Sequence, residues 1–298
     1  MGKKLVFRGA ASALITPMKK GKIDFCALEK IIESQISSGI DALVIGGTTG
    51  EAATLSDGER YELFSFVKDC TKARTKLIFG TGTNDTDTVI KHTRVASDIG
   101  CDATLVVTPY YNKGTFRGVT EHYKKIAVSS ETPIILYNVP SRTGVNLTMA
   151  QLEELAKIES IVGIKEASDS ADRLTELSKF GDELYLYAGN DSQIFLTLAL
   201  GGVGVISVVS NIYPKKISDM CHAYFSGDTA SAHKSQLELF EFIRLMFKET
   251  NPAPIKYAMS VAGLCKTDIR LPLFKPEKST RMAIKAEMIR LGFPNGKG

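Results

Sequence analysis

The sequence repeats one local pattern eight times: a short apolar run, a turn rich in Gly or Thr, and an amphipathic stretch with helical spacing. The apolar runs are residues 11–15, 42–45, 77–79, 103–107, 134–137, 161–164, 184–187 and 203–206. Strands that alternate with helices pair in parallel, and runs this apolar are buried on both faces. Eight such units close into a barrel filled by side chains, so the pattern predicts an α/β protein of the (β/α)8 TIM-barrel type.

The stretches between these runs are predicted to be helices. They are residues 25–38, 57–72, 86–99, 116–128, 149–157, 171–179 and 192–200. Several follow a residue that caps a helix start, such as Asp24, Ser56 or Asp85. On pattern alone, a doubly wound open sheet remains the alternative architecture.

After Ile206 the pattern changes to helices only, and prolines punctuate the turns. These helices are expected at residues 214–225, 229–248, 253–262 and 276–291. We therefore expect a barrel domain at residues 1–226 and a C-terminal helical region at residues 227–298. Residues 236–247 are more apolar than one buried face requires, so we expect them to serve both the core and a contact between subunits.

The composition excludes several classes of protein. Lysine and arginine number 37 against 33 acidic residues, with both signs interspersed, so no nucleic-acid partner is expected. No apolar stretch is long enough to cross a membrane, and no signal peptide is recognisable. The five cysteines lack a Cys-x-x-Cys spacing, and the four histidines lack the spacing of paired ligands. We expect no disulfide and no metal, and a location in the reducing cytoplasm.

Lys165 is the main candidate for chemistry, because active sites of such barrels lie at the carboxyl ends of the strands. Strand alternation places its side chain on the face of Gly163 and Ile161, which we expect to be the barrel interior. Burial lowers the pKa of an amine and leaves it neutral, as a Schiff-base nucleophile requires. The alternative is a structural ion pair with Glu166, although adjacent strand residues point to opposite faces.

Tyr137 closes the preceding run, so its phenol is expected to meet the Lys165 amine at the barrel mouth. A phenol can move protons while a carbinolamine forms and collapses; packing is the alternative role. The turn at residues 46–50 lacks the lysine and spacing of a phosphate-binding loop. Its hydroxyls, Thr48 and Thr49, suit a small carboxylate or a proton relay, with a simple capped turn as the alternative.

Several strand-end motifs resemble those of the dihydrodipicolinate synthases, also called 4-hydroxy-tetrahydrodipicolinate synthases. They are GGTTGE (residues 46–51), TPYYNK (108–113), YNVPSRTG (137–144) and GIKEAS (163–168), with GND (189–191) and GVIS (204–207) in support. The resemblance spans nearly the whole chain, within a group of pyruvate-dependent Schiff-base lyases that includes N-acetylneuraminate lyase. It implies condensation of pyruvate with L-aspartate 4-semialdehyde, the committed step toward diaminopimelate and lysine, with no cofactor beyond the enzyme's own lysine.

The resemblance also implies a role for each matching residue. Lys165 forms the imine with pyruvate, and Tyr137 donates and accepts the proton. Thr48 and Tyr111 complete a proton relay; in the family this tyrosine reaches in from a neighbouring subunit, which implies a homo-oligomer, a dimer or a homotetramer. The implied substrate-binding residues are Thr49 for the pyruvate carboxylate, Ile206 through its backbone, Gly189 as space above the imine, and Arg142 for the semialdehyde carboxylate.

Three other functions remain as alternatives. N-acetylneuraminate lyase shares the lysine and the tyrosine, but Arg142 and the Thr48-Thr49 pair favour the synthase. A non-catalytic ligand-binding barrel would tolerate loss of Lys165 or Tyr137, and both are present. A phosphate-handling isomerase would grip a phosphate with the loops after the seventh and eighth strands.

One part of the family pattern does not carry over. Lysine-inhibited members have two histidines after the GTTGE turn and an acid on the next unit, which form an allosteric site. The corresponding residues here are Asp57, Arg60 and Thr88, whereas Asn84 and Tyr110 still match. A bound lysine would lose donors for its carboxylate and a partner for its amino group, so we expect weak or absent feedback inhibition by L-lysine.

Overall fold

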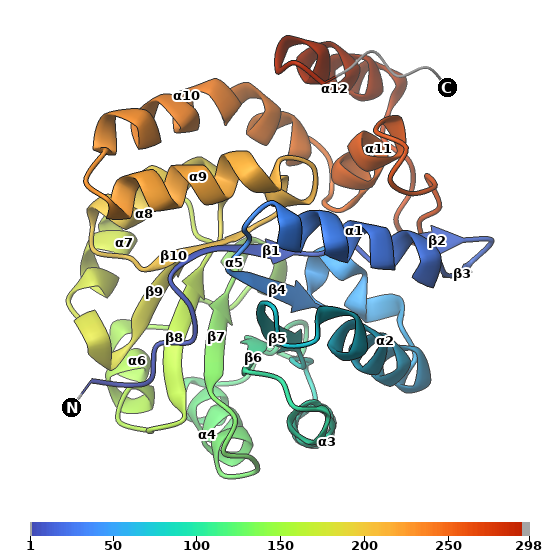
Figure 1. Cartoon of the computed structure of the whole chain (residues 1–298). Helices are drawn as coiled ribbons and strands as arrows, with labels where there is room; N and C mark the ends of the chain where they lie inside the picture. The colour runs from blue at the N-terminus through green and yellow to red at the C-terminus, as the bar shows by residue number, and fades with distance from the viewer. Residues whose placement is uncertain (1, 294–298) are drawn as a thin grey trace.

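The eight apolar runs form a closed barrel of parallel strands in the computed structural model, which describes residues 2–293 (Figure 1). In chain order the barrel strands are β1 (Gly9–Ala13), β4 (Ala42–Ile45), β5 (Lys76–Gly80), β6 (Ala103–Val107), β7 (Ile134–Asn138), β8 (Ile161–Glu166), β9 (Tyr185–Ala188) and β10 (Gly204–Ser207). Each strand pairs with its neighbour in the sequence, and β10 closes on β1. The predicted (β/α)8 barrel is confirmed, and the open-sheet alternative is wrong.

Helices cover the outside of the barrel. They are α1 (Phe25–Ser37), α2 (Asp57–Thr71), α3 (Thr86–Ile99), α4 (Phe116–Ala127), α6 (Met149–Leu155), α7 (Ala171–Ser178), α8 (Ile194–Ala199) and α9 (Pro214–Phe225). The predicted caps are present: the side chains of Asp24, Ser56 and Asp85 each accept a hydrogen bond from a backbone N–H in the first turn. No helix within residues 2–293 is long and apolar enough to cross a membrane.

Several short elements have no counterpart in the apolar pattern. They are the hairpin β2 (Met18–Lys19) and β3 (Lys22–Ile23), the helix α5 (Pro140–Thr143), and the 3-10 turns η1 (Thr48–Gly50), η2 (Ala52–Thr54), η3 (Gly181–Glu183), η4 (Asp191–Gln193) and η5 (Val209–Asn211). Elements this short carry too few apolar residues to show a period. Both η1 and α5 contribute residues to the mouth of the barrel.

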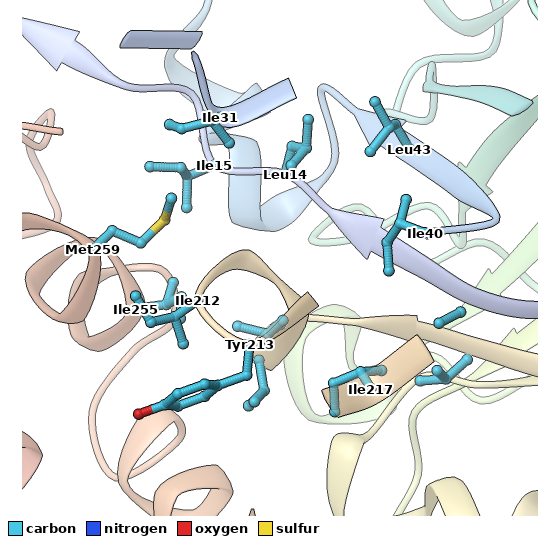
Figure 2. Packing of buried hydrophobic residues seen from close by; sticks show 14 of the residues in the cluster. Leu14, Ile15, Ile31, Ile40, Leu43, Ile212, Tyr213, Ile217, Ile255 and Met259 are labelled. Carbon is cyan, nitrogen blue, oxygen red and sulfur yellow. The ribbon is translucent and has the colours of Figure 1, made fainter. Parts of the chain in front are cut away.

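The C-terminal helices α10 (Thr229–Met246), α11 (Ala253–Val261) and α12 (Lys278–Arg290) pack against the barrel. Figure 2 shows Ile255 and Met259 of α11 beside Ile15, which follows β1, and Ile212, which follows β10. These residues belong to one buried apolar cluster. Residues on both sides of the expected boundary at residue 226 therefore share one core. The division into two regions stays a prediction.

Helix α10 has both buried and exposed apolar residues. Leu239, Phe242 and Met246 are buried in the cluster, which confirms the expected contribution of residues 236–247 to the core. Leu237 and Phe240 are exposed on the single chain. The expected subunit contact at these residues stays a prediction.

Strand β8 carries Lys165 into the barrel, but one residue of the strand faces differently from our expectation. The pairing of β7 with β8 shifts between Ile134 and Ile135, so Val162 is skipped in the register. Val162 packs with the interior cluster, whereas Ile161 packs with the cluster between the strands and the helices. The prediction that Ile161 faces the interior is wrong, because this bulge adds a residue and alternation restarts after it.

A buried ion pair joins the C-terminal region to the second strand-end turn. Lys256 of α11 donates to the carboxylate of Glu51, and both side chains are at most 1% exposed. Glu51 has a left-handed backbone (φ 57°), and its other carboxylate oxygen accepts from the backbone N–H of Arg270 at 2.9 Å. The turn that carries Thr48 and Thr49 is therefore fixed from the C-terminal side.

We predict that Lys256→Met destabilises the fold by about 3–5 kcal/mol, because it leaves the Glu51 carboxylate buried without its cation. Urea unfolding at one fixed protein concentration measures the change. The matched control is Lys215→Met, which removes an exposed pair with Asp219 and should shift the midpoint little. Equal midpoints for the two variants would contradict the importance of the buried pair.

Candidate active site

A cavity of about 480 Å³ opens at the carboxyl ends of the strands. Its lining includes Gly47 and Thr48 after β4, Tyr137 in β7, Arg142 in α5, and Asn251 from the loop between α10 and α11. The residues come from turns far apart in the sequence, as expected for a barrel active site. The C-terminal region contributes to the lining as well as to the core.

Lys165 lies next to this cavity, against the ring of Tyr137. The two residues are paired in the register of β7 and β8, and the Lys165 amine lies 4.3 Å from the centroid of the Tyr137 ring. Lys165 is 5% exposed, and burial lowers its pKa to about 8, partly offset by the negative charge of Asp191, while Arg142 lowers it further. The amine is therefore deprotonated far more readily than that of an exposed lysine.

The Tyr137 phenol is also buried, and burial raises its pKa. The positive charge of Arg142 and the Thr48 hydroxyl oppose this shift, whereas Glu166 adds to it. Tyr137 thus has a cation and a hydroxyl near its phenol, while the Lys165 amine lies over its ring. Thr48, Tyr137 and Lys165 are brought together as the strand-end positions predicted.

Glu166, the residue after Lys165, lies on the opposite face of β8. Its carboxylate accepts from both the Asn138 side chain, at 3.0 and 2.9 Å, and the Arg173 guanidinium, at 3.4 Å. The alternative in which Lys165 forms a structural ion pair with Glu166 is therefore wrong. Strand alternation directs one charge into the barrel and the other toward α7.

Thr49 and Arg142 are both held by Asn251. The Asn251 amide donates to the Thr49 hydroxyl at 3.0 Å, and the Arg142 guanidinium donates to the Asn251 backbone oxygen at 3.1 Å. Thr49 is buried, whereas Arg142 is exposed toward the cavity. Two residues expected to bind carboxylates therefore share one neighbour.

Tyr111 does not reach the site of its own chain. Its side chain is 89% exposed and its backbone is left-handed (φ 71°), whereas the preceding Tyr110 lines the cavity. A bulky aromatic residue rarely adopts a left-handed conformation without a structural or functional reason. The geometry leaves the Tyr111 ring available to another molecule.

Gly189 and Ile206 are buried and do not line the cavity. A Cβ atom at Gly189 would meet the Glu166 carbonyl oxygen at 2.6 Å, so a side chain there clashes with the strand that carries Lys165. Ile206 packs in the barrel interior with Tyr137 and Tyr187. The substrate-binding roles expected for these two residues stay predictions. Independently of any substrate, packing against β8 requires glycine at position 189.

Two polar residues near the site, Asp191 and Asn251, were not among the sequence candidates. Asp191 is buried near Lys165; it accepts from the Ser207 hydroxyl and the Val208 N–H, and burial raises its pKa. Its place after a strand end was a usable signal. Asn251 lies in a loop between two helices, with no periodic pattern to single it out.

No group of three or more His, Cys, Asp or Glu residues in the described chain is arranged to hold a metal ion.

Comparison with known proteins agrees with the motifs at the strand ends. The family model described as the dihydrodipicolinate synthetase family matches residues 6–290. The chain belongs to this family. It is 45% identical over 281 residues to the 4-hydroxy-tetrahydrodipicolinate synthase of Clostridium novyi, covering 94% of this chain and 95% of that protein. The family resemblance seen in the sequence is therefore confirmed.

Solved structures of the family share the fold over the same length. The dihydrodipicolinate synthase of Aquifex aeolicus aligns with a TM-score of 0.95 at 37% identity, covering 98% of this chain and 100% of that one. The chloride-inhibited enzyme of Acinetobacter baumannii, solved in complex with pyruvate, aligns with a TM-score of 0.94 at 38% identity. That alignment covers 96% of this chain and 99% of the other.

We predict that the reactivity of Lys165 rises with pH through about 8. Burial lowers the pKa from the ordinary 10.5 to about 8, so the neutral amine becomes the main form as the pH rises past that value. The measurement is the initial rate at which pyruvate and borohydride label the protein, with Lys165→Ala as the unlabelled control. A rate that still climbs above about pH 10, as for an exposed lysine, would contradict the prediction.

Proposed function

We propose that this chain is a 4-hydroxy-tetrahydrodipicolinate synthase, which condenses pyruvate with L-aspartate 4-semialdehyde. The observation that carries the proposal is the buried Lys165 amine, with its pKa lowered to about 8, 4.3 Å from the centroid of the Tyr137 ring. An amine that is easily deprotonated, beside a phenol, suits imine formation with a keto acid. Family membership over residues 6–290 supports the choice of reaction.

In the proposed mechanism the Lys165 amine attacks the keto carbon of pyruvate, and the carbonyl oxygen leaves as water. The resulting imine withdraws electrons, so that the pyruvate methyl group loses a proton and becomes an enamine. The enamine carbon attacks the aldehyde carbon of the semialdehyde. The amino group of the semialdehyde then displaces Lys165 and closes the ring. No cofactor is needed, because Lys165 itself supplies the electron sink.

The remaining residues serve proton transfer and substrate binding in this proposal. Tyr137 moves protons with Thr48, whose hydroxyl partly opposes the rise that burial causes in the pKa of the phenol. Thr49 binds the pyruvate carboxylate beside Ile206, and Gly189 keeps space above the imine. Arg142 binds the carboxylate of the semialdehyde, because its guanidinium lines the cavity and can grip a carboxylate with two N–H groups.

We also propose that the working enzyme is a cytoplasmic homo-oligomer, a dimer or a dimer of dimers. Tyr111 supports this, since its exposed ring and left-handed backbone suit insertion into the cavity of a second copy. There it would complete the relay of Thr48 and Tyr137. The exposed Leu237 and Phe240 of α10 provide apolar surface for a contact between copies.

A coupled assay with pyruvate and aspartate 4-semialdehyde tests the reaction. We expect turnover by the native chain and loss of about 10³-fold or more in Lys165→Ala, which removes the nucleophile. Cleavage of N-acetylneuraminate, measured in parallel, should be negligible. Cleavage of the sugar without use of the semialdehyde would make the chain an N-acetylneuraminate lyase. Absence of turnover with every substrate would favour the non-catalytic barrel.

We predict that Arg142→Ala mainly impairs use of the semialdehyde. Truncation removes the guanidinium at the cavity but leaves Lys165 and Tyr137 in place. The KM for the semialdehyde should rise by about 10- to 100-fold, as for loss of a charged hydrogen bond, while borohydride trapping of pyruvate changes little. Equal loss in both measurements would contradict the role given to Arg142.

We predict that L-lysine inhibits this enzyme weakly or not at all. Hydrogen bonds from Lys91 and His92 hold Asp57 ionised, with its pKa lowered to about 2, so this position presents a negative charge. Arg60 is buried and donates to the backbone oxygens of Gly80 and Ala52. The check is the coupled assay with increasing L-lysine and with D-lysine as the control. Specific inhibition by L-lysine in the low-millimolar range or below would contradict the prediction.

A further inference from the structure

Asn251 connects the two residues to which we assign the substrate carboxylates. It lies between α10 and α11, 202 residues from Thr49 and 109 from Arg142 along the chain. Its side chain is buried, yet the residue forms part of the cavity lining with Tyr137 and Arg142. The C-terminal region thus contributes a polar group at the point where the substrates would meet.

The direction of the bond between Asn251 and Thr49 determines what Thr49 can offer a ligand. A threonine hydroxyl has one hydrogen to donate and two lone pairs to accept with. The Asn251 amide N–H donates to the Thr49 hydroxyl oxygen at 3.0 Å, which occupies a lone pair. No acceptor for the Thr49 O–H is found among the described residues. The hydrogen therefore stays available for a negatively charged ligand.

The side chain of Asn251 also has an atom without a partner. Its amide oxygen is buried and accepts no hydrogen bond from any described residue. A buried polar atom without a hydrogen bond lowers the stability of the fold. Such an atom in a native structure calls for an explanation other than packing. Helix α11, which follows the loop, is joined to the turn of Thr49 by the buried ion pair between Lys256 and Glu51.

We propose that Asn251 is a positioning residue for pyruvate: it donates to Thr49, so that the Thr49 O–H points its hydrogen at the pyruvate carboxylate. The inference rests on the proposed function, because it assigns that carboxylate to Thr49. Arg142 is held through the Asn251 backbone oxygen, which a side-chain substitution leaves in place. Changes to the Asn251 side chain should therefore affect pyruvate and spare the semialdehyde.

The test measures the pyruvate concentration that gives half-maximal borohydride trapping. Asn251→Leu removes the donor at similar size, and we expect this concentration to rise about tenfold. Asn251→Asp replaces the donor by an acceptor that captures the Thr49 hydrogen and adds a negative charge, so we expect a rise of about a hundredfold. The KM for the semialdehyde should change by less than about twofold in Asn251→Leu, which adds no charge beside Arg142. Thr250→Ala, an exposed neighbour in the same loop, is the matched control.

A double-mutant cycle with Thr49→Val separates this role from general packing. In the Thr49→Val background, Asn251→Leu should raise the half-maximal pyruvate concentration by less than about twofold, since the coupled hydroxyl is gone. The same tenfold cost with and without the Thr49 hydroxyl would overturn the proposal. So would an Asn251→Asp variant that binds pyruvate like the native chain, because Thr49 would then be the donor of the pair.

Thermal unfolding of each variant shows that the comparison is made on folded protein. If Asn251→Leu does not fold, Asn251→Ser replaces it. Serine is polar but shorter than asparagine, so its hydroxyl can donate to Thr49 only weakly or through a water molecule. An intermediate rise in the half-maximal pyruvate concentration is then expected, and native behaviour would overturn the proposal. Failure of the native chain to trap pyruvate would instead refute the proposed function, so the two failures are distinguishable.

Discussion

The desolvation of one amine is the constraint on which the site depends. Lys165 lies in the barrel interior against the Tyr137 ring, and burial alone would push its pKa well down. Asp191 limits this shift and Arg142 adds to it, which leaves the pKa at about 8. At this pKa a far larger fraction of the amine is neutral near physiological pH than for an exposed lysine, and the neutral form is both the one that burial favours and the one that acts as a nucleophile. A carboxylate paired directly with it would favour the ammonium and suppress that reactivity.

Strand alternation separates the reactive groups from the groups that hold the strands in register. Tyr137 pairs with Lys165 on the inner face, and the next pair, Asn138 with Glu166, lies on the outer face. Asn138 donates to both carboxylate oxygens of Glu166, and Arg173 adds a further contact. A buried polar network with its partners satisfied fixes geometry well. The two side chains proposed to be catalytic, Tyr137 and Lys165, thus lie on strands that are held in register by polar contacts on the opposite face.

The barrel and the shared position of Tyr137 and Lys165 could be predicted from the sequence because both follow from local periodicity, whereas Arg142, Tyr111, Gly189 and Ile206 were assigned from the family resemblance. Apolar runs ending in Tyr137 and Lys165 place these residues at one mouth whatever the details of the loops. The inward position of Ile161 was wrong, since a bulge depends on pairing with β7 that no single run encodes. Asn251 could not be predicted for a related reason. Its contacts to Thr49 and Arg142 are tertiary, and its loop has no hydrophobic periodicity. Periodicity reports which face is buried, and it carries no information about which distant loop covers a strand end.

The central claim is that one buried lysine, among the many in this chain, forms the imine. The most direct measurement is peptide mapping by mass spectrometry after treatment of the folded protein with pyruvate and borohydride at neutral pH. The account predicts one adduct per chain, on the peptide that contains Lys165, with exposed lysines such as Lys215 unmodified. An adduct on another lysine with Lys165 unmodified, or no adduct on the folded protein, would contradict it.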